Sequence, residues 1–151
     1  MKKRYPRILT VLLVMLLAYG VPSRARPKET GTKLEGTWTV LSIKYGIDKE
    51  FSSFPKDKGH IKLLTPTHFM WVVYDVATKK VESSAGGTYS LDGNTYREQI
   101  DFASGEVEAL VGKPQIFTTK LDGDTWSLAG TLSNGLKIEE VWKRIPSKPI
   151  Q

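Results

Sequence analysis

Gly36-Thr37-Trp38 opens the part of the chain that we expect to fold, and Val141-Trp142-Lys143-Arg144 closes it. Between them lie short segments in which apolar and polar residues alternate, separated by turn residues. Strands at such close spacing pair antiparallel with their neighbours, and a sheet whose first and last strands also pair has no free edges. We therefore predict an all-β fold, an eight-stranded antiparallel up-and-down barrel, wide enough to hold one small molecule.

The strands are predicted at 34–45, 61–64, 68–75, 81–91, 95–102, 114–121, 125–132 and 136–145. Strong turn signals such as Asp92-Gly93-Asn94 and Asn134-Gly135 separate several of them. Gly86-Gly87, inside the fourth strand, predicts a bulge or sharp bend. The segment 46–59 is either a loop with a helical turn folded over one barrel mouth or a plain surface connection, and a short helix is expected around 106–110. A two-layer sandwich is the competing fold, although its connections are typically longer.

The first 25 residues have the pattern of a signal peptide. Residues 1–7 are basic without any acid, and residues 8–19 are almost wholly apolar. This run is shorter than the roughly 20 residues of a membrane-spanning helix, so an uncleaved anchor is the less favoured alternative. Cleavage is expected after Gly20 or Ala25. A flexible lead-in at 26–33, the barrel at 34–145 and a polar tail at 146–151 complete the single-domain mature chain.

Composition limits the classes of function. Five of the 22 basic residues precede Arg26, which leaves 17 basic against 16 acidic residues in the mature chain. This balance gives no electrostatic case for binding nucleic acid or an anionic membrane. The chain has no cysteine, which excludes disulfides, thiolate metal ligands and a lipid-modified N-terminal cysteine. We expect an exported protein, periplasmic or secreted, without stable membrane insertion after signal cleavage.

The alternation of residues along the strands predicts an interior. Apolar faces mark the inside of a barrel, although both faces of the segment 68–75 are apolar and its orientation stays open. Buried carboxylates need a partner or a proton, and Arg144 shares a strand face with Glu140. Glu98 and Glu140, the two glutamates on inward faces, either fix a polar ligand group or form a salt-bridge network that fills the closed end. The predicted ligand-binding residues are Phe69, Trp71, Tyr89, Tyr96, Glu98, Phe117, Trp126, Glu140 and Trp142.

Several motifs carry a resemblance to known proteins. The Gly-x-Trp start, the hairpin-linked strands and the Trp142-Lys143-Arg144 finish resemble the calycin superfamily of lipocalins and fatty-acid-binding proteins. The stretches 67–71, 86–89 and 132–142 look like exported bacterial lipocalin-like domains of unknown function, the DUF4488 type. The resemblance spans residues 34–145. It implies that Trp38 packs at the closed end of the barrel and that Arg144 covers it, a structural role.

These features favour a binding protein over an enzyme. The leading hypothesis is a barrel that binds a small, mostly apolar or amphipathic molecule. One alternative is a protein-interaction module that uses the 46–59 loop, with Phe51 and Phe54, or the barrel exterior. Another is a cavity enzyme with Glu98 and Glu140 as an acid/base pair. A metal bound by His60 and His68 is conceivable, but ordinary strand histidines are favoured, and we expect no metal and no cofactor. The sequence names neither the ligand nor a protein partner.

Overall fold

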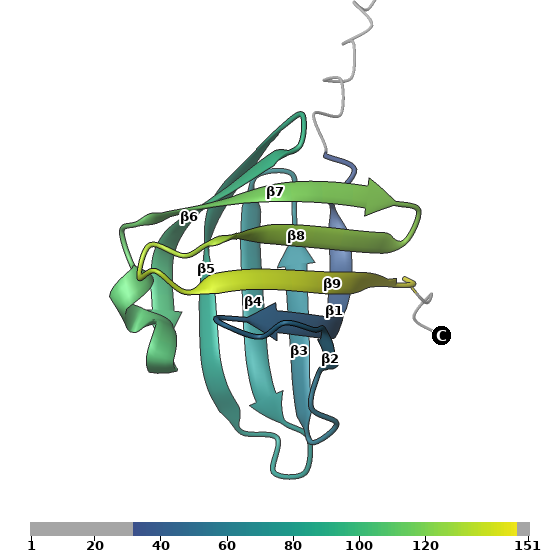
Figure 1. Cartoon of the computed structure of the whole chain (residues 1–151), viewed down its shortest axis with the longest axis vertical. Coiled ribbons are helices and arrows are strands. Elements are labelled where there is room, and N and C mark those ends of the chain that lie inside the picture. The colour runs from purple at the N-terminus through teal and green to yellow at the C-terminus, as the bar shows by residue number, and fades with distance from the viewer. Residues whose placement is uncertain (1–31, 148–151) are drawn as a thin grey trace, which may run out of the picture.

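The barrel predicted from the sequence is the fold of the protein (Figure 1). The computed structural model describes residues 32–147, so the predicted signal peptide, the lead-in up to residue 31 and the tail from residue 148 lie outside the described residues. The elements are β1 (Gly36–Tyr45), β2 (Ser52–Ser53), β3 (Lys58–Leu64), β4 (His68–Asp75), β5 (Val81–Asp92), β6 (Thr95–Ser104), the 3₁₀ helix η1 (Gly105–Leu110), β7 (Pro114–Asp122), β8 (Thr125–Thr131) and β9 (Lys137–Ile145).

Pairing of the first and last strands closes the barrel. β1 pairs antiparallel with β9 from Thr37–Ile145 to Tyr45–Ile138, while its other side pairs with β3 and, further along, with the two-residue β2. Each of the remaining strands pairs antiparallel with the next one in sequence. The eight-stranded up-and-down topology is therefore confirmed, and the competing two-layer sandwich is wrong.

Glycines sit where the chain must turn or where strands come unusually close. Gly93 and Gly123 begin the tight β5–β6 and β7–β8 turns with φ values of 54° and 57°, which glycine adopts without strain. In β5 the pairing shifts register between Gly86 and Gly87, as predicted for this pair. A Cβ atom on Gly87 would lie 1.9 Å from the Gln99 carbonyl oxygen, so only glycine allows β5 and β6 this approach.

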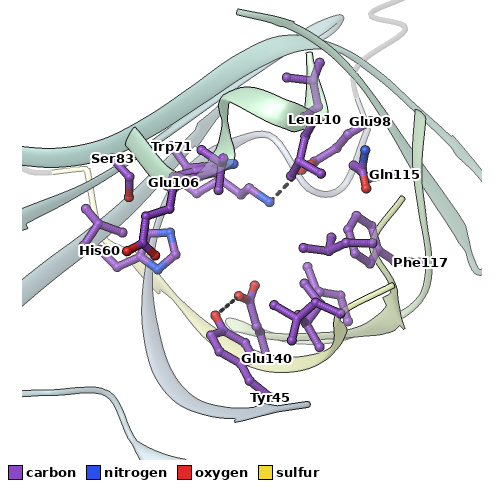
Figure 2. Close-up of a pocket in the computed structure, with 18 of the residues that line it drawn as sticks. Tyr45, His60, Trp71, Ser83, Glu98, Glu106, Leu110, Gln115, Phe117 and Glu140 are labelled. Carbon is purple, nitrogen blue, oxygen red and sulfur yellow. Dashed lines mark hydrogen bonds and ion pairs between the residues drawn. The ribbon is translucent and has the colours of Figure 1, made fainter. Parts of the chain in front are cut away.

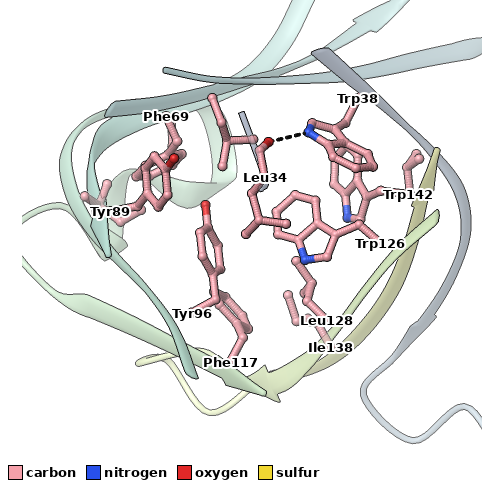
Figure 3. Close-up of a cluster of buried hydrophobic side chains, with 14 of the residues drawn as sticks. Leu34, Trp38, Phe69, Tyr89, Tyr96, Phe117, Trp126, Leu128, Ile138 and Trp142 are labelled. Carbon is pink, nitrogen blue, oxygen red and sulfur yellow. Dashed lines mark hydrogen bonds between the residues drawn. The ribbon is translucent and has the colours of Figure 1, made fainter. Parts of the chain in front are cut away.

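One end of the barrel interior is packed solid (Figure 3). Trp38 and Trp126 are fully buried, with ring centroids 5.5 Å apart in an edge-to-face arrangement. Trp38 Nε1 donates to the Leu34 carbonyl at 2.8 Å, and the Arg144 guanidinium carbon lies 4.1 Å from the centroid of the Trp38 ring. Arg144 also donates to the main-chain carbonyls of Lys33 and Glu35. These hydrogen bonds hold the first described residues across this end of the barrel.

At the other end of the barrel, the strands are less completely paired with their neighbours. β6 pairs with β7 only through Thr95–Gln99, although β6 continues to Ser104, and η1 follows directly. The helix expected around 106–110 is this η1. The 46–59 segment has no helical turn; it contains β2 instead, and Phe54 is partly buried against the core. These two segments lie around the open part of the interior.

Candidate ligand-binding cavity

A cavity of about 330 Å³ occupies the interior beyond the packed end (Figure 2). Its wall draws on most of the barrel strands, on η1 and on Phe54. The aromatic and aliphatic wall residues are Phe54, Trp71, Val73, Ile100, Val107, Leu110, Phe117, Leu128, Leu132, Leu136, Ile138 and Trp142. The polar wall residues are Tyr45, His60, Lys62, Ser83, Glu98, Glu106, Gln115 and Glu140. Since Glu106 is exposed, the cavity reaches the surface beside η1.

The structure divides the predicted ligand-binding residues between two places. On the cavity wall are Trp71, Glu98, Phe117, Glu140 and Trp142. In the buried core, but not on the wall, are Phe69, Tyr89, Tyr96 and Trp126. Tyr89 belongs to the packed end, because its hydroxyl donates to the Thr65 carbonyl at 2.7 Å. The face of β4 that carries Phe69, Trp71 and Val73 is the inner one, which resolves the orientation that the sequence left open.

A buried ion pair forms the floor between the cavity and the packed end. Lys62 Nζ lies 2.7 Å from Glu98 Oε1, and both side chains are about 5% exposed or less. The Tyr96 hydroxyl donates to the same oxygen at 2.8 Å. The ammonium also lies 5.3–5.7 Å from four ring centroids, those of Phe69, Tyr96, Trp126 and Trp142. A buried carboxylate is tolerable here because its charge is paired.

Sequence reasoning missed Lys62 and assigned the counter-charge to Arg144. That assignment is wrong: Arg144 lies over Trp38, forms an ion pair with Asp124 and makes no ion pair with Glu140. Four residues along a strand span about 13 Å, so Glu140 and Arg144 share a face but lie at different depths. The available signal was the alternation along this strand, which places Lys62 on the same face as the apolar Leu64.

Glu140 lies on the wall with two neutral hydrogen-bond donors. Tyr45 Oη donates to Oε1, and Trp142 Nε1 donates to Oε2 at 2.9 Å. Burial raises the pKa of Glu140, while the nearby Lys62 charge and the two hydrogen bonds oppose the rise. The pKa of Tyr45 is also raised, first by burial and then by the Glu140 charge. This tyrosine therefore stays a neutral donor.

His60 is the least satisfied polar group of the cavity. It is 8% exposed, and neither ring nitrogen has a hydrogen-bond partner among residues 32–147. Its ring centroid lies 4.6 Å from that of Trp142, 5.4 Å from that of Phe54 and 5.5 Å from that of Trp71. Burial and the Lys62 charge lower the pKa of His60 to about 3, so the imidazole is neutral at pH 7. Such a group can donate and accept one hydrogen bond each.

The structure does not bring the two histidines together. His68 is exposed and begins β4, whereas His60 lies on β3 opposite Val73, near the other end of this hairpin. The two-histidine metal site considered from the sequence therefore does not form. Within residues 32–147, no three His, Asp or Glu side chains gather in a way that could hold a metal ion. The cavity can offer hydrogen bonds, ring faces and carboxylate charge to a molecule inside it.

Known proteins share this fold. The chain is similar to the crystal structure of a lipocalin-like protein from Bacteroides uniformis, with TM-score 0.54 and 13% identity over 74% of this chain and 98% of that chain. It is also similar to an uncharacterized protein from Bacteroides eggerthii, with TM-score 0.51 and 14% identity over the same shares. At such identities the likeness establishes the fold alone, and the protein has a lipocalin-like β-barrel fold.

No protein-family model matches the chain, and no curated protein matches it significantly. The resemblance to DUF4488-type domains therefore stays a prediction. In residues 32–147 there is no helix with both the length and the apolar character that crossing a membrane requires.

Proposed function

We propose that the protein is an exported lipocalin-like barrel that holds one small, mostly apolar molecule in its interior. The observation that carries the proposal is the cavity of about 330 Å³, whose wall combines twelve apolar side chains with a buried histidine that finds no hydrogen-bond partner in the described part of the chain. Small-molecule sites are typically concave, mainly apolar and supplied with a few convergent polar groups. The cavity has all three properties.

The energetics favour an apolar body for this molecule. Each apolar surface element that leaves water contributes about 25 cal/mol per Å². Trp71, Phe117 and Trp142 present aromatic surface to the cavity from three different strands, β4, β7 and β9. A flat or branched apolar molecule would contact several of these faces at once. His60 and Glu140 would then fix the position of any polar group that it carries.

Export belongs to the same proposal and is supported by the sequence of residues 1–25. The basic start, the short apolar run and the small residues after it are the parts of a signal peptide. We further propose that the chain is a member of the exported bacterial DUF4488-type group, on the strength of the motifs at 67–71, 86–89 and 132–142. N-terminal sequencing of the protein secreted by a bacterial host would test export, with a start after Gly20 or Ala25 expected.

A cavity-blocking variant tests ligand binding directly. Val73 lies on the cavity wall, and its neighbour Val72 lies on the opposite face of β4. Val73→Trp should take up part of the cavity and obstruct it, and Val72→Trp is the matched control that adds the same bulk outside. We expect the neutral fluorophore prodan to bind the wild type and Val72→Trp with a blue-shifted emission, and not to bind Val73→Trp. Equal binding to all three proteins would contradict an interior site.

Native mass spectrometry of protein purified from its source provides a second test. A stoichiometric adduct that is absent from Val73→Trp is the expected result. If neither an adduct nor prodan binding is found, the proposed function fails.

One observation favours a second candidate function, a protein-interaction module. Ile47 is 97% exposed and Phe51 is 45% exposed, both in the 46–59 loop, whereas Phe54 turns inward to the cavity. In this case Ile47→Ser with Phe51→Ser should abolish capture of a protein partner and leave prodan binding unchanged. Loss of prodan binding in that variant would instead assign the loop to the cavity mouth.

A further inference from the structure

We infer that the molecule held in the cavity carries a positively charged amino group, which pairs with the Glu140 carboxylate while the apolar part contacts the surrounding rings. The inference rests on the proposed function and specifies the chemical class of its ligand. Its basis is the charge balance of the cavity wall, the contacts of Glu140 and the position of His60.

The cavity wall is acidic. Three carboxylates, those of Glu98, Glu106 and Glu140, face one ammonium, that of Lys62. Lys62 is already paired with Glu98 at 2.7 Å and is enclosed by four aromatic rings. An anionic ligand such as a fatty acid would therefore meet two carboxylates without a free cation. A cationic ligand would reduce the net negative charge of the wall.

Glu140 has room for a cation in its hydrogen bonding. The two hydrogen bonds that it accepts, from Tyr45 and Trp142, reach different oxygens, so each oxygen keeps a further lone pair. Within residues 32–147, no Lys or Arg forms an ion pair with Glu140. Burial raises the pKa of Glu140, and the nearby Lys62 charge and the two hydrogen bonds offset this rise only in part. A ligand ammonium would supply the missing charge.

His60 and Trp142 lie beside Glu140 and suit the same group. The Trp142 ring contacts His60, with centroids 4.6 Å apart, and its Nε1 donates to Glu140. Figure 2 shows His60, Tyr45 and Glu140 around the same part of the cavity. A neutral imidazole has one unprotonated nitrogen that can accept from an ammonium N–H. The indole faces of Trp71 and Trp142 can add cation–π attraction.

Three matched compounds separate charge from shape: 4-phenylbutylamine, 4-phenylbutan-1-ol and 4-phenylbutanoate. Isothermal titration calorimetry at pH 7.5 would measure the Kd of each for the wild type, Glu140→Gln and Glu139→Gln. Glu139 directly precedes Glu140 on β9 but faces outward to Lys44, so its variant removes the same charge outside the cavity. We expect the amine to bind the wild type and Glu139→Gln at least about tenfold more tightly than the alcohol, and the carboxylate most weakly.

Glu140→Gln should bind the amine no more tightly than the alcohol. Unchanged binding of the alcohol would show that this variant is folded. Equal Kd values for the three compounds, or tightest binding of the carboxylate, would overturn the amine inference but leave the interior site intact. Undiminished amine binding to Glu140→Gln would overturn it as well. If prodan binds and none of the three compounds does, the amine inference fails alone; if prodan also fails to bind, the proposed function fails with it.

Discussion

His60→Leu should stabilise the barrel, although it removes a wild-type side chain from the interior. The imidazole is 8% exposed, and within the residues that the structure describes both of its nitrogens lack a hydrogen-bond partner. A buried polar group in this condition costs about 1–3 kcal/mol. Leucine is similar in volume and has no polar atom to satisfy. At pH 8 we expect the free energy of unfolding to rise by about 1–2 kcal/mol.

The stability that His60→Leu gains over wild type should grow as the pH falls. The pKa of His60 is lowered to about 3 in the fold, against about 6.5 in the unfolded chain. Below pH 6.5 the unfolded wild type binds a proton that the native state does not, so wild-type stability falls with pH between about 6.5 and 3. At pH 5 this loss is about 2 kcal/mol, at 1.36 kcal/mol per pKa unit. The leucine variant escapes it, so its advantage should reach about 3–4 kcal/mol at pH 5.

Urea unfolding followed by tryptophan fluorescence, between pH 5 and pH 8, would measure both effects. His68→Leu is the control, because His68 is the only other histidine and is exposed on β4. Its effect should stay within about 0.5 kcal/mol at every pH. A difference between His60→Leu and wild type that is the same at pH 5 and pH 8 would refute the reasoning, since His60 would then titrate alike in the folded and unfolded states.

Three further predictions concern the buried charges and the strand contact. Lys62→Met should destabilise the barrel by about 3–5 kcal/mol by stranding Glu98, and Lys62→Met/Glu98→Gln should recover most of the loss; simple additivity in urea unfolding would contradict the coupling. Gly87→Ala should cost about 3 kcal/mol because its Cβ would meet the Gln99 carbonyl at 1.9 Å, and an unchanged Tm would disprove this contact. Burial raises the pKa of Glu140 in the fold. The protonated side chain therefore contributes to stability below the pKa that Glu140 has in the unfolded chain, and this contribution is lost as the pH rises through its pKa in the folded protein. Glu140→Gln should therefore gain stability over wild type from pH 4 to pH 8, and a constant difference would count against a raised pKa.

The fold was predictable because its determinants are local. Asp92-Gly93-Asn94 and Asn134-Gly135 mark turns by their composition, and the alternation along β9 sets its inner face. The Gly86-Gly87 pair also predicted a bulge or bend, and the structure has a register shift at this pair. Strand bounds differ by a few residues, most at the start of β3, where Lys58-Gly59-His60 continues the strand without a recognisable strand pattern.

The site was only partly predictable because it depends on depth as well as face. Phe69 and Trp71 share the inner face of β4, yet Phe69 lies in the packed core and Trp71 on the cavity wall. Alternation reports the face of a residue but not its distance from the closed end. Lys62 was missed for a related reason: its partner Glu98 lies 36 residues further along the chain. Only closure of the barrel brings such residues together.

The solid packing of Trp38 and Trp126 has a kinetic consequence for any guest in the barrel. The tryptophan rings and the Arg144 guanidinium block the packed end of the barrel. A ligand must therefore enter and leave at the opposite end, where Phe54 and Val107 line the cavity. We therefore expect the residence time of a bound molecule to depend on the motion of that rim. Bulkier side chains on its outer edge should slow entry and escape by equal factors, leaving the equilibrium occupancy where it was.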